Sequence, residues 1–355
     1  MDESRGADGE SAGAAPGPTV SVIVLAHDRR QFLRGAVESV VGQDLPRTSY
    51  EIIVVKGFSD PAIDAYLANI GAESIVVPPT PGAFKVVTGI RRSRGRIILI
   101  LDDDDVFEPS RLRAVVDAFR RRPMLGFFSN QMTFIGPDGT PLRRHGVHDL
   151  APRRGGMKEP LLLEEPEKDR NLSQLSRWKP DFNASSGAIR RELVDRTMPY
   201  LERLRITVDT LFFFAALCSE YSVQLDPRLL TRYRIHGDNS TRAGPGNPEA
   251  RLGRLIDVAR QTEADYRVIR EFVARAGRPF ALRLIEARMA VNHLTLASRD
   301  PQSRRRTFTG LVPELVRHLD TYPVREDFLG VLATGLFVLS PSLGRAVYQR
   351  QLGIR

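Results

Sequence analysis

A run of four consecutive carboxylates is the strongest chemical feature of the sequence: Asp102, Asp103, Asp104 and Asp105. Carboxylates this close repel one another, so we expect a cation to neutralise them. Alternate residues of an extended segment face the same way, so Asp102 and Asp104 can converge on one divalent ion. Asp103 or Asp105 is then left to bind ribose or a backbone amide. Hard oxygen ligands favour Mg²⁺ or Mn²⁺ as the ion.

Another carboxylate, Asp209, stands just before the apolar run 211–217. A carboxylate in such a place can take a proton from a hydroxyl group as a general base. It can equally cap the helix that the run predicts, in competition with Thr207. Helix capping is also the alternative for the run of four, because a helix dipole near Pro109 stabilises acidic side chains, but it accounts for only one or two of them.

The elements that must position these residues form an α/β pattern from Val20 onward. Short β-branched runs alternate with helical patterns, which predicts βαβ units and a largely parallel sheet. The predicted strands are 20–25, 51–55, 74–77 and 96–101, and the predicted helices are 32–41, 61–69, 83–92 and 110–121. Ligands of open α/β sheets bind beyond the carboxyl ends of the strands, where the acidic run lies.

The following part of the chain predicts a mixed sheet and then helices. A strand is expected over 125–134, and the turn residues 136–139 predict an antiparallel hairpin after it. Residues 143–179 are polar and weakly periodic, so we expect a flexible segment over the site. Order returns with a strand at 186–190, helices at 192–204 and 209–218, and extended structure at 223–234. Two long helical patterns, 250–276 and 280–297, predict a helical appendage.

Composition excludes several classes of protein. Of the 355 residues, 42% are hydrophobic and 27% are charged, which excludes disordered, collagen-like and disulfide-scaffold proteins. The single cysteine, Cys218, is interpreted as a buried small hydrophobe in a reducing compartment. The net charge of +9 comes mostly from scattered arginines, with no basic tract or RNA-binding motif, so we expect no nucleic acid partner.

The two ends of the chain bear on its location. Residues 1–18 lack the order of a secretory signal, which predicts a disordered leader and a cytoplasmic protein. Residues 328–340 carry almost no polar side chain, but a bilayer span needs about twenty residues. The segment is interpreted either as a buried core helix or as a peripheral contact in the plane of the inner membrane face. Five arginines would assist that contact: Arg304, Arg305, Arg306, Arg345 and Arg350.

Five segments, in the expected order over residues 20–241, resemble family 2 glycosyltransferases of the nucleotide-diphospho-sugar-binding type-A fold. Residues 21–29 resemble the opening segment that packs around the nucleotide, and the acidic run resembles the aspartate-any-aspartate metal motif. Residues 183–190 are similar to the strand that leads into the acceptor half. Asp209 begins an apolar helix, as the catalytic-base region does, and residues 233–240 resemble the closing motif.

The resemblance implies an α/β fold with a Rossmann-like mixed sheet flanked by helices and a C-terminal helical appendage. Combined with the composition of the first residues and the helical patterns near the end, it predicts a disordered leader at 1–18, a transferase domain at 19–245 with its nucleotide-sugar-binding half at 19–141 and its acceptor half at 142–245, and a helical region at 246–355 that is either core or membrane-associated. The implied activity is inverting, metal-dependent transfer of a sugar from a nucleotide-diphospho-sugar donor to a hydroxyl group. The acceptor would be a glycan or a lipid-linked saccharide.

Specific residues take roles in this scheme. Asp209 would be the catalytic base, and Asp102, Asp104 and His236 would hold Mg²⁺ or Mn²⁺. The expected nucleotide-sugar contacts are Ala26, His27, Asp28, Arg29, Lys56, Asp102, Asp103, Arg234 and His236. A satisfied core histidine is the alternative for His236, and a packing or solvated role is the alternative for Arg234.

Two departures from the family pattern affect these roles. Lys56 and Gly57 stand where the family usually has paired acidic residues after the second strand, so Lys56 is expected either to meet a phosphate or base carbonyl or to be solvated. Val208 stands where a second acidic residue often precedes the base. A sugar nucleotidyltransferase is the alternative enzyme, although it normally has a Gly-rich basic loop after the first strand. A non-catalytic saccharide-binding or membrane-binding protein of the same fold is the other alternative.

Overall fold

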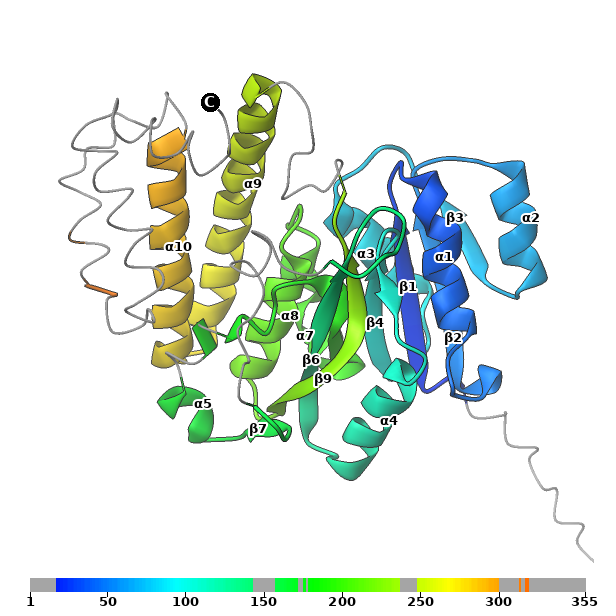
Figure 1. The fold of residues 1–355 in the computed structure, drawn as a ribbon. Coiled ribbons are helices and arrows are strands. Elements are labelled where there is room, and N and C mark those ends of the chain that lie inside the picture. Colours follow the sequence, from blue (N-terminus) through cyan, green and yellow to red (C-terminus); the bar gives the residue numbers. More distant parts are fainter. Residues whose placement is uncertain are drawn as a thin grey trace, which may run out of the picture.

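The computed structural model of the chain describes residues 17–142, 157–171, 175, 176, 178–236 and 248–299, and also 313, 317 and 318. In the described part a mixed sheet has the strand order β3-β2-β1-β4-β8-β6-β9-β5, and β7 pairs with β9 (Figure 1). The predicted leader, apart from its last two residues, and the apolar segment 328–340 lie outside the described residues.

The first half of the sheet is parallel, as the sequence predicts. Its strands are β1 (Val20–Ala26), β2 (Tyr50–Lys56), β3 (Glu73–Val76) and β4 (Ile97–Asp102). Strand β1 lies between β2 and β4, and its register brings Leu25 beside Asp102. The connecting helices are α1 (Arg30–Val41), α2 (Pro61–Asn69) and α3 (Gly82–Arg92), with a 3-10 turn η1 (Arg47–Ser49). The three strands and three helices predicted before β4 are therefore confirmed, with ends that agree to within two residues.

Alternate residues of β1 supply two separate cores, one on each face of the sheet. Val22 and Val24 pack with α1, α2 and α4 (Arg111–Arg121), whereas Ile23 and Leu25 pack with α3 and the later helices (Figure 1). Burying each such side chain contributes roughly 1.5–3 kcal/mol. A Cβ atom at Gly89 of α3 would lie 2.4 Å from Ile23, so only glycine lets α3 approach β1 this closely.

The second half of the sheet mixes strand directions. Strand β8 (Gly187–Arg190) is antiparallel to both β4 and β6 (Leu125–Ile135), and β6 is parallel to β9 (Ser222–Arg234). A two-residue strand, β5 (Val106–Phe107), pairs with β9 and was not predicted. The 3-10 turn η2 (Ala184–Ser186) leads into β8, and α7 (Arg191–Leu201) and α8 (Val208–Leu217) follow.

Two predictions for the middle of the chain need correction. The turn at 136–139 forms and the chain returns antiparallel to β6, but up to residue 142, where the described residues end, this pairing is an isolated bridge between Ile135 and Pro141 and not a full strand. Residues 143–156 lie outside the described residues, but the rest of the expected flexible segment contains β7 (Leu161–Leu163) and α5 (Glu167–Arg170). The buried Lys168 amine donates to the carbonyl oxygens of Ala216 and Ser219, at 3.0 and 2.8 Å. These elements are too short to produce a readable period.

The C-terminal helices α9 (Pro248–Arg275) and α10 (Pro279–Arg299) lie side by side beyond α8 (Figure 1). Their apolar side chains, such as Ile269 and Leu284, belong to the same buried cluster as Phe213 and Phe214 of α8. The two helices therefore extend the core of the sheet. Among the described residues no helix has the length and apolar character needed to cross a membrane. Cys218, predicted to be buried, is half-buried against this cluster, and removal from water raises the pKa of its thiol to about 12.

Candidate active site

The acidic run lies in a tight turn at the carboxyl end of β4. The amide of Asp105 donates to the carbonyl of Asp102 at 3.2 Å, so the chain leaves the extended conformation directly after β4. The turn gathers Asp102, Asp104 and Asp105, each of which offers an oxygen within 4.8 Å of the others. An extended chain predicted only Asp102 and Asp104 as a converging pair, and the turn adds Asp105 because it reverses the chain.

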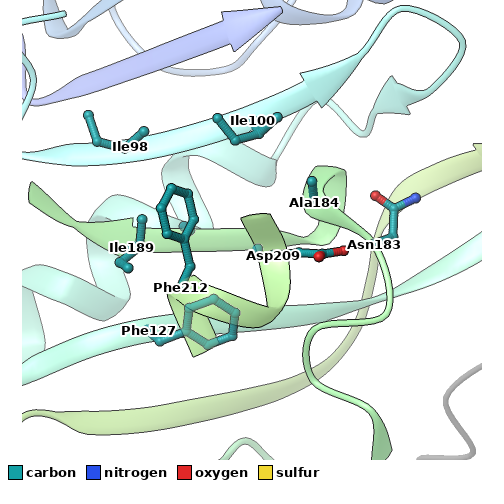
Figure 2. A pocket seen from close by; sticks show the side chains of 10 residues that line it. Ile98, Ile100, Phe127, Asn183, Ala184, Ile189, Asp209 and Phe212 are labelled. Carbon is teal, nitrogen blue, oxygen red and sulfur yellow. The ribbon is translucent and has the colours of Figure 1, made fainter. Parts of the chain in front are cut away.

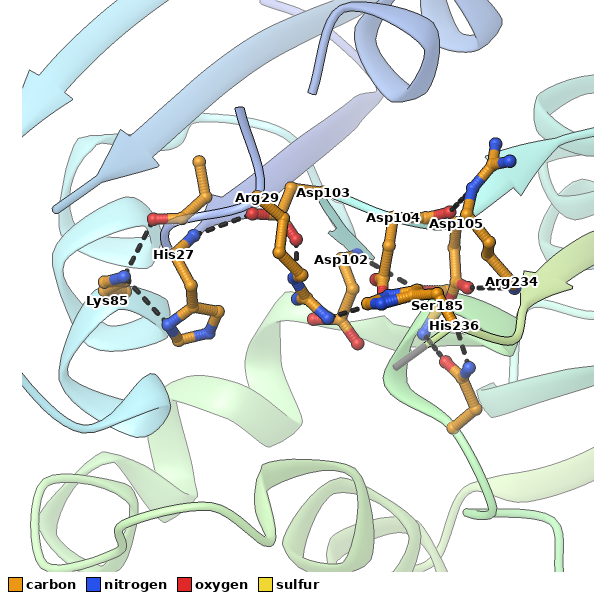
Figure 3. A network of polar contacts seen from close by, with 12 residues as sticks. His27, Arg29, Lys85, Asp102, Asp103, Asp104, Asp105, Ser185, Arg234 and His236 are labelled. Atoms are coloured by element: carbon orange, nitrogen blue, oxygen red, sulfur yellow. Dashed lines mark hydrogen bonds and ion pairs between the residues drawn. The ribbon is translucent and has the colours of Figure 1, made fainter. Parts of the chain in front are cut away.

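Asp103 points the other way, toward the first turn after β1. Its backbone amide donates to the carbonyl of Leu25 at 3.1 Å, and its carboxylate accepts from the amide of His27 at 2.8 Å. The guanidinium of Arg29 lies 2.5 Å from the Asp103 carboxylate and also forms an ion pair with Asp104 (Figure 3). Asp103 thus binds a backbone amide and holds the turn 27–29 against the acidic cluster.

The end of β9 contacts the cluster from the opposite side. The amide of Arg234 donates to Asp105 at 3.0 Å, and its Nε donates to the carbonyl of Asp104 at 2.8 Å (Figure 3). Nε2 of His236 lies 2.9 Å from Oδ2 of Asp104. The ring of Phe32 in α1 lies 4.9 Å from the His236 ring and 4.8 Å from the Arg234 guanidinium. The resemblance placed both residues near the metal or phosphates, and the structure brings both to the acidic cluster.

Burial and mutual repulsion disfavour the ionised forms of carboxylates in the cluster. Burial raises the pKa of Asp102 to about 7 and that of Asp103 to about 6, and the charge of Asp104 adds to both shifts. Burial, followed by the neighbouring carboxylates, also raises the pKa of Asp105 well above its ordinary value. Arg29 opposes the shifts of Asp102 and Asp103. Three converging carboxylates with residual negative charge form a donor set that suits a hard divalent cation.

Asp209 lies in the first turn of α8. Thr207 is the N-cap residue of α8, and the Asp209 carboxylate accepts from the adjacent amide of Thr210 at 2.8 Å, so the capping alternative does not describe Asp209. The carboxylate lines a narrow, mostly apolar pocket and faces Asn183, while Phe212 and Ile98 form part of the apolar wall (Figure 2). Shielding from water raises the pKa of Asp209 to about 8, and the charge of Asp181 adds to the shift.

Asn183 connects this pocket to the acidic cluster. Its amide nitrogen donates to the Asp105 carboxylate at 2.9 Å, and its oxygen accepts from the amide of Ser185 at 2.5 Å. The Ser185 hydroxyl accepts from the amide of Asp102 at 3.1 Å. Residues 183–190 were predicted only as a strand and its approach, so these two side chains were not identified from the sequence. Their signal is the Asn-x-Ser spacing, which places an N-cap side chain at the start of a short turn.

Lys85 of α3 is a further cation beside the turn after β1, and it was not among the residues predicted from the sequence. Its buried amine donates to the carbonyl of Ala26 at 2.8 Å and lies 3.0 Å from Nδ1 of His27 (Figure 3). Burial, and then the charge of Lys85, lowers the pKa of His27 to about 4, so this imidazole is neutral near pH 7. A lysine on the buried face of an amphipathic helix was the available signal.

Two further residues expected to contact the nucleotide-sugar, Lys56 and Asp28, lie in different surroundings. Lys56 is fully buried, 2.6 Å from the carboxylate of Asp64, and donates to the carbonyl of Phe58 at 3.0 Å. Its amine is thus held against α2, and none of its bonds joins the acidic cluster. Asp28 is exposed in the turn between β1 and α1. The structure thus gathers Ala26, His27, Arg29, Arg234 and His236 around the acidic run but leaves Lys56 outside the group.

Comparison with known proteins gives a family match over the half of the chain that carries the acidic run. The family model described as "Glycosyl transferase family 2" matches residues 21–197. The succinoglycan biosynthesis protein ExoO of Rhizobium meliloti (strain 1021) is 26% identical over 232 residues, which are 63% of each chain, so the match spans less than two thirds of ExoO. An uncharacterized glycosyltransferase of Nostoc sp. (strain PCC 7120), alr2836, is 25% identical over 273 residues, covering 73% of this chain and 76% of that protein.

Solved structures share the fold. TarS of S. aureus superimposes with a TM-score of 0.56 at 15% identity, covering 88% of this chain and 50% of TarS. The mannosyltransferase PcManGT of Pyrobaculum calidifontis, solved in complex with GDP-Man and Mn²⁺, gives a TM-score of 0.52 at 15% identity, covering 96% of this chain and 86% of that one. At these identities the similarity concerns the fold: a mixed sheet flanked by helices, of the type-A class predicted from the sequence.

Proposed function

The chain belongs to glycosyltransferase family 2, and on that premise we propose that it is an inverting, metal-dependent enzyme that uses a nucleotide-diphospho-sugar donor. The observation that carries the proposal is the shared wall between the acidic cluster and the Asp209 pocket. Asn183 bonds to Asp105 on one side and lines the pocket with Asp209 on the other. The residues that would hold a metal ion and the donor diphosphate therefore lie on one side of this wall, and the proposed general base lies on the other.

The donor side consists of the cluster and the cations around it. Asp102, Asp104 and Asp105 would hold Mg²⁺ or Mn²⁺, and His236 lies beside them on Asp104. The bound ion supplies positive charge for the departing diphosphate. Arg29 and Arg234 add two fixed cations at the same place, where negative charge develops as the anomeric bond breaks. The complex of PcManGT with GDP-Man and Mn²⁺ supports a donor of this class.

The acceptor side is the Asp209 pocket. A sugar hydroxyl has a high pKa and must lose its proton as it attacks, and a carboxylate with a raised pKa is suited to accept it. Asp209, with a pKa of about 8, has this property. Attack from the Asp209 side, opposite the diphosphate, inverts the anomeric centre. The pocket wall formed by Phe127, Phe212 and Ile100 keeps water from one face of the base.

The acceptor we propose is a saccharide, free or lipid-linked, in polysaccharide biosynthesis. The similarity to ExoO, whose name places it in succinoglycan biosynthesis, supports this class. A peripheral position at the inner face of the cell membrane, through residues 328–340, belongs to the same proposal; that segment lies outside the described residues. The sugar nucleotidyltransferase alternative is less favoured, because the turn after β1 has no Gly-rich basic loop.

The test compares two reactions of the full chain. In the first, UDP-, GDP- and dTDP-sugars are supplied with Mn²⁺ and saccharide acceptors, and release of nucleoside diphosphate is measured. In the second, nucleoside triphosphates and sugar phosphates are supplied. Transfer predicts turnover only in the first, abolished in the Asp104→Asn and Asp209→Asn variants and retained in Asp117→Asn, a control on α4 whose carboxylate pairs with Arg120. Turnover only in the second reaction, or full activity of both site variants, would refute the proposal.

A further inference from the structure

The last described helix, α10, reaches the neighbourhood of Asp209 through Arg288. The guanidinium of Arg288 forms a two-pronged ion pair with Asp181, in which Nη2 lies 2.9 Å from Oδ1 and Nη1 pairs with Oδ2. Both side chains are largely buried, with exposed fractions of 17% and 4%. The guanidinium also lies 5.7 and 5.3 Å from the rings of Phe213 and Phe214 in α8. Bidentate pairs of this kind fix the orientation of both partners.

Asp181 is in turn a direct neighbour of the Asp209 region. The hydroxyl of Thr210, the next residue along α8, donates to the Asp181 carboxylate. The charge of Asp181 raises the pKa of Asp209 more than that of any other ionised group, and Arg288 acts in the opposite direction. Asp181 thus places a second carboxylate beside the base, and Arg288 is the cation that offsets it.

The remaining groups that face Asp209 do not compensate Asp181. Asp102, at the end of β4, adds negative charge and raises the pKa of Asp209 further. Tyr266 of α9 also lies in this environment, and burial raises the pKa of its phenol to about 12, so it is neutral near pH 7. Among the groups that act on Asp209 in the described part of the chain, Arg288 therefore carries the compensating positive charge.

Helix α9 holds the start of α8 through a separate contact. The buried Asp265 carboxylate accepts from the amides of Arg205, Ile206 and Thr207, at 2.9, 2.8 and 2.9 Å. Three successive amides directed at one carboxylate fix the backbone of that loop. The loop also meets the donor side, because the carbonyl of Arg205 accepts from the amide of Ala83 at 3.0 Å, at the start of α3. The position of α9 is thereby tied to the position of Asp209.

We propose that Arg288 is a positioning residue for Asp209, which it serves by pairing with Asp181 and so keeping the Asp181 charge and the Thr210 contact in place. The inference rests on the proposed function, in which Asp209 is the base. It makes α9 and α10 part of the catalytic unit. The sequence had indicated only a helical appendage at this position.

Opposite substitutions distinguish this role from simple packing. In the Arg288→Gln variant, Asp181 faces Asp209 without its cation, so the ionised form of Asp209 becomes less favourable. In the Asp181→Asn variant, Arg288 faces Asp209 without its anion, so the ionised form becomes more favourable. Nearby charges move a carboxyl pKa by about 1–3 units. The double variant removes both charges and should return the pKa of Asp209 toward that of the unmodified protein.

The experiment measures the titration of Asp209 in the unliganded full chain by NMR, with ¹³C at the aspartate carboxyl carbons. The Asp209→Asn variant identifies the signal. We expect the titration midpoint to rise in Arg288→Gln and to fall in Asp181→Asn, by about one pH unit or more in each case. Arg288→Lys, which retains the charge, should stay near the unmodified value. Arg270→Gln is the matched control, because Arg270 also joins α9 to α10, through Glu286 at 2.7 Å, and no bond of this pair joins the Asp209 pocket.

Transfer assays over the same pH range complete the test. The acid limb of kcat/KM should move in the same direction as the titration in each variant, with the donor KM unchanged. Midpoints that move in the same direction in Arg288→Gln and Asp181→Asn, or that move no more than in Arg270→Gln, would overturn the positioning role while Asp209→Asn still abolishes transfer. An active Asp209→Asn variant would instead overturn the base assignment itself, and the positioning role with it. If Arg288→Gln does not fold, the titration midpoint of Asp209 is compared between Asp181→Asn and the double variant. The midpoint should be lower in Asp181→Asn and should return toward the unmodified value in the double variant.

Discussion

His236 and Asp104 contact one another through Nε2 and Oδ2 at 2.9 Å, although 132 positions separate them in the chain. The long parallel pairing of β6 with β9 produces this contact, because it carries the end of β9 to the edge of the sheet where β4 ends. The cluster is the turn after β4, and two other segments enclose it: the turn after β1, which contributes Arg29, and the end of β9, which contributes Arg234 and His236.

Replacing Asp104 should remove metal and donor binding together. Asp104 accepts from both Arg29 and His236 and belongs to the converging triad, so Asp104→Asn reduces the charge that would hold a divalent ion. We expect affinity for Mn²⁺ to fall at least about tenfold, as is usual for changes at and around metal ligands. Thermal-shift titrations with Mn²⁺ alone, and with Mn²⁺ and a nucleotide-sugar, measure the effect. An unchanged shift would show that the triad does not bind the ion.

Replacing Asp209 should affect turnover and leave donor binding intact. Asp209→Asn removes the proton acceptor, and we expect kcat to fall by about 10²- to 10⁴-fold. The donor dissociation constant should be unchanged, because the Asp209 carboxylate accepts from the amide of Thr210 in its own helix and, within the described residues, is not hydrogen-bonded to the acidic cluster. In the unmodified enzyme kcat/KM should rise with pH through about 8, the pKa of this carboxyl. A flat pH profile between 6 and 9 would contradict the base role.

The same carboxylate should lower stability at high pH. Because the folded state raises the pKa of Asp209 from 3.8 to about 8, it holds a proton that the unfolded chain releases between these values. The free energy of unfolding therefore decreases as pH rises from about 4 to about 8. The Asp209→Asn variant lacks this contribution, so it should gain stability relative to the unmodified protein over that range. Urea unfolding at several pH values measures the difference in the free energy of unfolding between the two proteins. A difference that stays constant with pH would contradict the prediction.

Two buried lysines should behave differently. Lys85 bonds to Ala26 and His27 beside the donor turn, whereas Lys56 pairs with Asp64 against α2. Lys85→Met should raise the KM for the donor, and Lys56→Met should leave it unchanged. Both should destabilise the fold by about 1–3 kcal/mol, because each leaves buried acceptors without a donor. Measuring the donor KM and the melting temperature of both variants separates the effect on donor binding from the effect on stability. A raised donor KM in Lys56→Met would show that Lys56 also contributes to donor binding.

The loop before α8 should depend on α9. Asp265→Ala removes the acceptor of three amides, each bond to a charged group contributing about 1.5–3 kcal/mol. We expect a lower melting temperature together with a lower kcat at unchanged donor affinity. Glu271→Gln is the control on the same helix, because its pair with Arg203 is exposed. An unchanged kcat in Asp265→Ala would show that turnover does not depend on the contact between α9 and this loop.

The sequence predicted the repeating part of the fold because strong periods and clear turns are local properties. The helix at 61–69 is confirmed at both ends, since Asp60 caps it and Pro61 begins it. Strand β7 was missed because three residues cannot show a period, and its formation depends on pairing with β9. The same limit applies to the site. Arg288 lies 107 positions from Asp181, and nothing near either residue in the sequence indicates that they meet.

The position of β8 has a mechanical consequence. This strand carries hydrogen bonds to β4 on one side and to β6 on the other, so the donor-facing and acceptor-facing parts share one continuous ladder. A hinge motion between these parts would have to break the hydrogen bonds of β8 to β4 or to β6. The separation between the end of β4 and the start of α8 is accordingly set by the strands of the sheet.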